Sequence, residues 1–300
     1  MRHIPVLLNE VLEGLNLSKN SKVIDCTLGD AGHSEAILDK IGPKGKLLGI
    51  DADPESLLRA KRNLYRYEKQ VIFVRDNFVN LKEIVVDNGF KNVDAILLDL
   101  GWSTPQFKER SRGFSFENDE PLDMRYGGVM GETATDIIND YSEIELEKIL
   151  RYYGEEKLSR EIAKEIVGAR AVNKIDHTAP LVEIILGVYR RKLKTDKEVP
   201  WIGGIHPATK VFQALRIAVN KELEVLRQVL PQAVEMLSRG GRLAVISFHS
   251  LEDRIVKQFF VKYQNKTVKI INKKPFTASE EEMQNNTSSR SAKLKNKKKI

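Results

Sequence analysis

The feature that most constrains the fold is a pair of apolar segments that each lead to an aspartate. One apolar run, within residues 22–28, contains Asp25 and is followed by a turn with Gly29 and Gly32, and a second apolar run ends in Asp51. A strand, a glycine turn, a helix and a second strand with a terminal carboxylate form the order typical of nucleoside sites in doubly wound folds. Glycine lets the backbone approach a ligand closely, and a carboxylate can accept hydrogen bonds from both hydroxyls of a ribose.

The turn differs from the fingerprint of dinucleotide sites. Its glycines are spaced Gly-x-x-Gly, and Asp30 occupies the place that a pyrophosphate would approach. A carboxylate there disfavours a diphosphate but suits a cofactor with positive groups, such as the sulfonium and amino groups of S-adenosylmethionine. We therefore expect S-adenosylmethionine as cofactor. The alternative is that these glycines and aspartates only end strands, as they do in many parallel sheets.

The rhythm of apolar segments predicts an α/β fold with an insertion. Strand-like runs at 22–28, 46–51, 71–75 and 93–99 alternate with helix-like segments at 34–41, 54–67 and 78–87, as in right-handed βαβ units. From about residue 105 to 206 the pattern is helical and lacks a convincing buried strand. A long helix near 208–238, a strand at 241–248, a helix at 251–263 and a strand near 267–272 are expected to follow. We predict a Rossmann-like sheet domain at 1–106 and 207–300, interrupted by an all-helical domain at 107–206 that overhangs the ligand site.

Charge and cysteine usage point to a polyanionic partner and a reducing compartment. The net charge is +7, and a run of basic residues crowds the C-terminus: Arg290, Lys293, Lys295, Lys297, Lys298 and Lys299, with Lys266, Lys269, Lys273 and Lys274 upstream. Such a run can follow a phosphate backbone or form a solvated tail. The single cysteine, Cys26, excludes an internal disulfide and is expected to be a core residue. With no apolar stretch near 20 residues, we expect a cytoplasmic protein without a membrane span.

A third strand-end carboxylate predicts the chemistry. Asp99 ends the run 95–99 and precedes a loop with glycine, hydroxyls, proline and an amide. In an exocyclic amino group of a base, the nitrogen lone pair is delocalised into the ring, but methylation needs this lone pair on the nitrogen. Hydrogen-bond acceptors that face the two N–H bonds help to localise it there. A rigid Ser103-Thr104-Pro105 turn can direct backbone carbonyls outward, since proline restricts both itself and the preceding residue. A plain strand-to-loop turn is the alternative.

At this point the sequence resembles the MraW/RsmH family of S-adenosylmethionine-dependent cytosine-N4 methyltransferases of small-subunit ribosomal RNA. The matching segments follow the family's order through most of the chain: His3–Leu8, Asp25–Ser34, Asp51–Pro54, Asp99–Gln106, Arg112–Phe116, Pro121–Arg125, His206–Ile217, Ser247–Arg254 and Arg290–Leu294. The resemblance implies a class I methyltransferase sheet with an inserted helical substrate-recognition domain. This agrees with the fold that the apolar rhythm predicts.

The resemblance also implies roles for individual residues. Ala31, Gly32 and His33 would form the turn under the methionine part of the cofactor, with Gly29 before them. Asp51 would hold the ribose hydroxyls and Phe78 would lie beside the adenine, while Asp99 and Gln106 would complete the site near the methyl group. Asp99 with Ser103, Thr104 and Pro105 would form the catalytic group. The family usually has glycine in place of Ala31, and a methyl group there is tolerated if φ stays negative.

Further residues are candidates for substrate contact. Trp102 could stack on the target base, and His33 could either cap its helix or contact ligand. Five basic residues could each contact an RNA phosphate or instead form a salt bridge within the protein: Arg112, Arg125, Lys210, Arg216 and Arg254. His206 and His249 lie in family motifs, but no spacing resembles a metal site and direct methyl transfer needs none.

The expected activity is methyl transfer to the N4 amino group of a cytidine in small-subunit RNA, either free or in the assembled subunit, by a monomer or homodimer. The target base must be unpaired or turned out of its stack. A covalent cysteine route is disfavoured because the one thiol lies in the cofactor strand. Two alternatives remain open: methylation of a small amine or a protein, and an RNA-binding assembly factor that binds the cofactor without turnover.

Overall fold

The structure is a computed structural model that describes residues 4–100, 111–127, 131–272 and 274–300. Contacts between residues divide the chain into two compact units. Unit 1 comprises Met1–Thr104 and Leu223–Ile300, and unit 2 comprises Pro105–Glu222. Each unit is described separately below.

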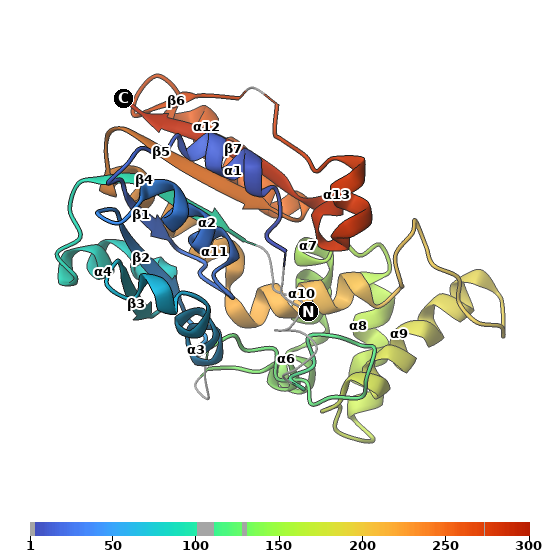
Figure 1. The fold of residues 1–300 in the computed structure, drawn as a ribbon. Coiled ribbons are helices and arrows are strands. Elements are labelled where there is room, and N and C mark those ends of the chain that lie inside the picture. The colour runs from blue at the N-terminus through green and yellow to red at the C-terminus, as the bar shows by residue number, and fades with distance from the viewer. Residues whose placement is uncertain (1–3, 101–110, 128–130, 273) are drawn as a thin grey trace. The chain divides into compact units, whose positions relative to one another are not determined.

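Unit 1 is built on a seven-stranded sheet with the strand order β3-β2-β1-β4-β5-β7-β6 (Figure 1). The strands are β1 Lys22–Asp25, β2 Lys46–Asp51, β3 Val71–Arg75, β4 Val93–Asp99, β5 Leu237–Ser247, β6 Val268–Ile270 and β7 Lys293–Lys299. Strands β1 to β5 pair in parallel, while β7 is antiparallel to both β5 and β6. The four strands expected before residue 100 are thus present, and they pair in parallel as expected of βαβ units.

Helices cover the sheet of unit 1 and explain its apolar strands. They are α1 Leu8–Leu15, α2 Gly32–Ile41, α3 Pro54–Asn63, α4 Leu81–Asp87, α11 Glu222–Met236, α12 Ser250–Tyr263 and α13 Glu280–Asn285, with short 3-10 helices η1 Tyr65–Tyr67, η2 Phe78–Asn80 and η3 Thr287–Ser291. Residues Ile24, Leu48, Ile96 and Leu98 of the central strands are fully buried, as expected of a parallel sheet. No described helix is long and apolar enough to cross a membrane.

The structure differs from two expectations about the second half of the chain, one on the helix near 208–238 and one on the C-terminal lysines. The expected long helix near 208–238 is two helices, α10 Thr209–Asn220 and α11, because Lys221 between them adopts φ +50°, which a helix cannot continue. The solvated tail that was one interpretation of the last lysines is also wrong. Lys293–Lys299 forms β7, inserted between β5 and β6, with Lys295, Asn296 and Lys297 buried.

Unit 2 is helical, and its described residues form no strand beyond isolated bridges. Its helices are α6 Ala134–Asp140, α7 Glu143–Tyr153, α8 Ser159–Arg170, α9 Thr178–Leu193 and α10. Capping boxes start α6 at Thr133 and α7 at Ser142. The contact division returns to unit 1 after Glu222, because α10 packs on α7 and α6. The domain limits at 106 and 206 stay predictions.

Candidate functional site

The candidate site lies where three neighbouring strands of unit 1 end in carboxylates. Asp25, Asp51 and Asp99 are the last residues of β1, β2 and β4. The register aligns Asp25 with Leu97 on one side and with Gly49 on the other, so the three ends meet at one edge of the sheet. Ligands of open α/β sheets bind at this edge.

The Asp51 carboxylate is held by backbone N–H groups. Its Oδ2 accepts a hydrogen bond from Gly29 N at 2.8 Å, and its Oδ1 accepts one from Asp53 N at 2.9 Å. Asp53 in turn caps α3 through the backbone N–H of Ser56. The glycine turn and the end of β2 therefore fix the orientation of the carboxylate that was expected to hold the ribose.

The turn between β1 and α2 uses left-handed backbone at two positions. Gly29 has φ +51° and Ala31, the residue before α2, has φ +65°. The condition stated for a methyl group at Ala31, a negative φ, is not met. Because this conformation costs a residue with a Cβ atom about 1–2 kcal/mol, the glycine usual at this position has a conformational reason.

Gly32 permits a close approach of the N-terminal segment. A Cβ atom built on Gly32 would lie 3.2–3.3 Å from ring atoms of Pro5. His33, the next residue, is buried, and its Nε2 donates a hydrogen bond to the Val6 carbonyl oxygen at 2.9 Å. The segment before α1 is thereby attached to the first turn of α2.

His33 also faces the candidate catalytic carboxylate. Its Nδ1 lies 3.4 Å from Asp99 Oδ2, an ion pair when the ring carries both protons. The His33 ring thus links the N-terminal segment to the end of β4, and its contact with a ligand stays a prediction.

Thr27 is a site residue that the sequence analysis missed. Its hydroxyl Oγ1 accepts a hydrogen bond from Asp99 N at 2.8 Å, and its own N–H donates to Asp25 Oδ1 at 3.1 Å. Asp25 Oδ2 accepts a second bond from the Ser34 hydroxyl at 2.7 Å. The pattern Asp-x-Thr at a strand end is the signal that could have indicated this bridge.

Burial shifts the ionisation of two residues beneath the site. Desolvation raises the pKa of Asp25, although the Ser34 hydroxyl opposes this shift. The Cys26 thiol is fully buried next to it, and desolvation followed by the nearby Asp25 charge raises its pKa well above the ordinary value. Cys26 is therefore a core residue and a poor nucleophile.

Asp30 does not present a bare carboxylate to a ligand. Its Oδ1 accepts a hydrogen bond from Arg59 Nε at 2.7 Å, and the pair is mostly buried. The argument against a diphosphate from the Asp30 charge is thus weaker than the sequence suggests. The Asp30 charge therefore does not decide which cofactor binds.

Phe78 lies beside the edge that Asp51 defines. It is the first residue of η2, which follows β3, and Asp76 N donates a hydrogen bond to the Asp51 carbonyl oxygen at 3.2 Å. Asp76 in turn accepts bonds from Asn77 N and from the Asn80 amide. Phe78 therefore sits in a turn anchored to the end of β2, and its expected adenine contact stays a prediction.

The loop after β4 lies outside the described residues. This applies to Trp102, Ser103, Thr104, Pro105 and Gln106, for which the expected roles stay predictions. The described part of the site consists of Gly29, Ala31, Gly32, His33, Asp51, Phe78 and Asp99, all expected from the sequence, together with Thr27.

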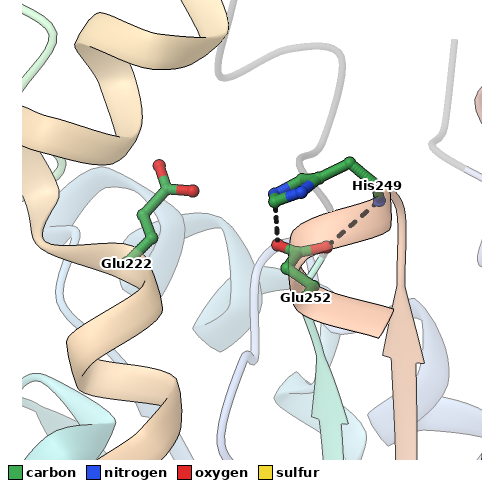
Figure 2. Close-up of side chains that lie close together, drawn as sticks. All are labelled: Glu222, His249 and Glu252. Carbon is green, nitrogen blue, oxygen red and sulfur yellow. Dashed lines mark hydrogen bonds and ion pairs between the residues drawn. The ribbon is translucent and has the colours of Figure 1, made fainter. Parts of the chain in front are cut away.

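The family motif after β5 forms the start of α12. Figure 2 shows His249 and Glu252, whose side chains pair at 3.2 Å between Nε2 and Oε1. Glu252 Oε2 accepts a hydrogen bond from Phe248 N at 2.8 Å and is nearly fully buried. His249 thus has a local structural contact at the end of β5.

Several basic residues of unit 2 that were candidates for phosphate contact have internal partners. Arg216 pairs with Glu222 at 2.9 Å, and Arg125 pairs with Asp123 at 2.7 Å. Glu222 is the third residue drawn in Figure 2. Further internal bonds run from Arg112 to the Arg125 carbonyl oxygen and from Lys210 to the Glu155 carbonyl oxygen. Arg125 and Arg216 therefore form internal salt bridges. The His206 ring stacks on the Phe116 ring, with 4.7 Å between the ring centres.

The strand order, with its antiparallel seventh strand, and the carboxylate-lined edge define an α/β enzyme of the class I methyltransferase type, as expected. A family model described as the MraW methylase family matches residues 1–300. The chain belongs to the MraW methylase family, a family of methyltransferases that use S-adenosylmethionine.

Curated relatives match over nearly their whole length. The chain is 44% identical over 310 residues to the ribosomal RNA small subunit methyltransferase H of Clostridium botulinum (strain Kyoto / Type A2), covering 98% of this chain and 97% of the relative. It is 43% identical to the protein of that name from Brevibacillus brevis, covering 98% and 96%. For Clostridioides difficile (strain 630) the identity is 42% and the coverage 99% of each chain. The expected family is confirmed.

Solved structures resemble the chain more weakly. A putative rRNA methylase from Clostridium thermocellum has a TM-score of 0.48 and 12% sequence identity, with full coverage of both chains. The assignment therefore rests on the family model and the sequence relatives.

Proposed function

We propose that the protein methylates the N4 amino group of a specific cytidine in small-subunit ribosomal RNA, with S-adenosylmethionine as methyl donor. The relatives' names support the RNA, since each is a ribosomal RNA small subunit methyltransferase. The motif resemblance supports the cytosine N4 atom. The observation that carries the proposal is the placement of Asp99, which is fixed by Thr27 and His33 at the same sheet edge as Asp51.

The described residues fit the cofactor by their donor and acceptor chemistry. Carboxylates at the ends of β2 and β4 suit ribose hydroxyls and positive groups, and the turn at Gly29–His33 brings backbone close to a ligand. In this proposal Asp51 holds the ribose, Phe78 contacts the adenine, and Ala31, Gly32 and His33 lie under the methionine part. Gln106 would complete the site from the loop after β4.

Asp99 acts on the amino group of the base. When bound, S-adenosylmethionine supplies a methyl group made electrophilic by its sulfonium. In the transfer, N4 would bond to the methyl carbon as the carbon–sulfur bond breaks, S-adenosylhomocysteine would be the leaving group, and one amino proton would pass to water. The Asp99 carboxylate and the backbone carbonyls of the Ser103-Thr104-Pro105 turn would accept hydrogen bonds from the N4 amino group. These bonds would direct the nitrogen lone pair to the methyl group. The buried Cys26 is not placed for a covalent route.

The substrate sets further expectations. N4 takes part in base pairing, so the target cytidine must be unpaired or turned out of its stack. A ribosomal substrate places the enzyme in the cytoplasm. We expect it to act as a monomer or a homodimer, on free RNA or on the assembled subunit.

The experiment incubates the enzyme and methyl-labelled S-adenosylmethionine with small subunits from cells that lack this protein. A parallel incubation uses naked small-subunit RNA. Nucleoside mass spectrometry should find the label in N4-methylcytidine in at least one of them. Label in another nucleoside would overturn the proposed acceptor atom.

Two further outcomes would replace the proposal. Absence of label from both substrates, together with measurable binding of S-adenosylmethionine, would favour an assembly factor without turnover. Label in a protein or a small amine would assign a different acceptor.

A further inference from the structure

The basic residues of the C-terminal region include an internal set on β7 and an external set that precedes it in the chain. Lys295 pairs with Asp253, and Lys297 Nζ lies 4.8 Å from the centre of the Phe260 ring. Lys299 Nζ donates hydrogen bonds to the carbonyl oxygens of Glu235 and Leu237 at 2.9 and 2.6 Å. These three lysines serve the packing of β7 on α11 and α12 and are not available to a partner.

The external set lies on α12, on β6 and in the segments that follow them. From Arg254 to Ser279 the sequence holds seven lysine and arginine residues and no aspartate or glutamate. Six of these cations are described, and all six are exposed: Arg254, Lys257, Lys262, Lys266, Lys269 and Lys274. We call these six residues the α12–β6 basic surface.

The two acidic residues of α12 make contacts within unit 1. Glu252 is buried and pairs with His249, while Asp253 pairs with Lys295. Both acidic residues of α12 are therefore occupied within unit 1. These two carboxylates pair with His249 and Lys295 and not with Lys257 or Lys262 of the same helix, and a lysine-rich surface attracts polyanions.

The surface begins at the edge of the sheet that carries the candidate site. Asp99 pairs in register with Ile246 of β5, and α12 starts at Ser250 just after this strand ends. A helix of 14 residues extends about 21 Å from that edge. The basic surface can therefore contact several phosphates of a nucleic acid whose target nucleotide lies at the strand ends.

We propose that the α12–β6 basic surface binds the phosphate backbone of small-subunit RNA outside the methylated nucleotide. This inference rests on the proposed function, since it takes the RNA as substrate. Lysines are point charges that position a backbone without reading its sequence. Their neutralisation should weaken RNA binding in a salt-dependent manner and leave the cofactor site unchanged.

An explanation without RNA exists for one residue. Lys269 lies on β6, an edge strand, where lysines protect against pairing with another chain. This explanation does not extend to Lys257 on α12 or to Lys266 in the loop after it. The two accounts differ in what RNA binding should show.

The test compares two triple variants of the full chain. Lys257→Gln/Lys266→Gln/Lys269→Gln removes three charges from the surface. Lys44→Gln/Lys69→Gln/Lys91→Gln removes three charges from exposed lysines in the loops before β2, β3 and β4. Both variants change the net charge equally and should keep the wild-type circular dichroism spectrum and the affinity for S-adenosylmethionine.

The measurement is the affinity for a small-subunit RNA transcript as a function of salt. The surface variant should bind roughly tenfold more weakly near physiological salt, and its slope of log affinity against log salt should fall by about 2–3, since each phosphate contact contributes about 0.7–0.9. The loop variant should retain the wild-type slope. Equal slopes in the two variants would overturn the proposal.

Methyl transfer by the wild-type protein, measured in the same preparations, separates this inference from the proposed function. If the wild type methylates RNA and both variants bind RNA equally, the proposed function stands and the proposed role of the α12–β6 basic surface is wrong. Loss of slope in the surface variant without any transfer by the wild type would keep the surface and overturn the function. Charge-dependent binding to anionic vesicles with unchanged RNA affinity would assign the surface to a membrane and would also overturn it.

Discussion

At the scale of single residues, the site depends on backbone conformation as much as on side chains. Ala31 holds a left-handed conformation at φ +65° directly before α2, and its methyl group is fully buried. The Thr27 hydroxyl holds the backbone N–H of Asp99, and His33 Nδ1 lies 3.4 Å from the Asp99 carboxylate oxygen Oδ2. Each of these positions allows a separate prediction.

Replacement of Ala31 by glycine should leave the free energy of unfolding nearly unchanged. Relief of about 1–2 kcal/mol of left-handed strain offsets the loss of a buried methyl group, worth about 0.8 kcal/mol, and the greater freedom of the unfolded chain. Ala60→Gly, at a buried position within α3, is the control and should lose about 2 kcal/mol. Urea denaturation measures both, and equal losses would show that Ala31 is not strained.

Asp99→Asn should abolish most of the turnover while the protein stays folded. The amide keeps the shape but removes the negative charge that orients the amino group, so kcat should fall about 10²–10³-fold. Asp94→Asn, at the exposed start of the same strand, is the control and should retain activity. Label transfer to small-subunit RNA measures both, and full activity of Asp99→Asn would contradict the assigned role.

At the scale of elements, β7 decides how unit 1 packs. It lies between β5 and β6, and its alternate side chains face opposite layers. Asn296 packs against Gly14 of α1, while Lys295 and Lys297 contact α12. The close approach of α1 to the strand requires the absence of a side chain at Gly14.

Gly14→Ala should destabilise the protein, although alanine favours helices. The new Cβ would lie 2.2 Å from Asn296 Nδ2, so the Asn296 side chain must move at a cost of about 1–3 kcal/mol. Addition of Asn296→Ala should restore most of this loss in thermal denaturation.

The matched control is Gly168→Ala in α8, where a new Cβ would meet nothing described within 4 Å. This change should raise the free energy of unfolding by up to about 1 kcal/mol. Stabilisation by Gly14→Ala as well would contradict the close packing of α1 on β7.

At the scale of the whole molecule, stability depends on both ends of the chain. Glu282 of α13 accepts a hydrogen bond from Leu7 N at 2.7 Å, and the Asn286 amide donates one to the Ile4 carbonyl oxygen. The C-terminal strand itself carries a buried cation. Burial, followed by repulsion from Lys295, lowers the pKa of Lys297 to about 8.

The Lys297 pKa predicts a rise of stability with pH. Because the folded pKa lies below that of the unfolded chain, near 10.4, the unfolded state binds more protons between about pH 8 and pH 10.4. The free energy of unfolding should therefore rise across this window.

Lys297→Met, which keeps the apolar stem without the charge, should be more stable than the wild type at pH 7. The expected gain is on the order of 1–3 kcal/mol and should vanish near pH 10.5. Denaturation curves at several pH values measure it. An equal pH dependence in both proteins would contradict a shifted Lys297.

The sequence by itself determined the first half of the sheet, the insertion and most of the candidate site. Apolar runs that end in Asp25, Asp51 and Asp99 form strands wherever they lie in the chain, because burial on both faces of a parallel sheet selects such runs. A glycine turn and a terminal carboxylate are local signals too. The family followed from motifs in their order along the chain, which needs no structure.

Only the tertiary structure decided that the C-terminal lysines form a partly buried strand. Lysine is depleted in strands, and a local reading of Lys293–Lys299 indicates a solvated tail. The segment is a strand because β5 and β6 pair with its backbone and because Asp253 and Phe260, far away in the sequence, receive two of its ammonium groups. The same holds for the contacts of Asp99 with Thr27 and His33, since pairing across a sheet is a non-local choice that depends on which partners the complete fold brings together.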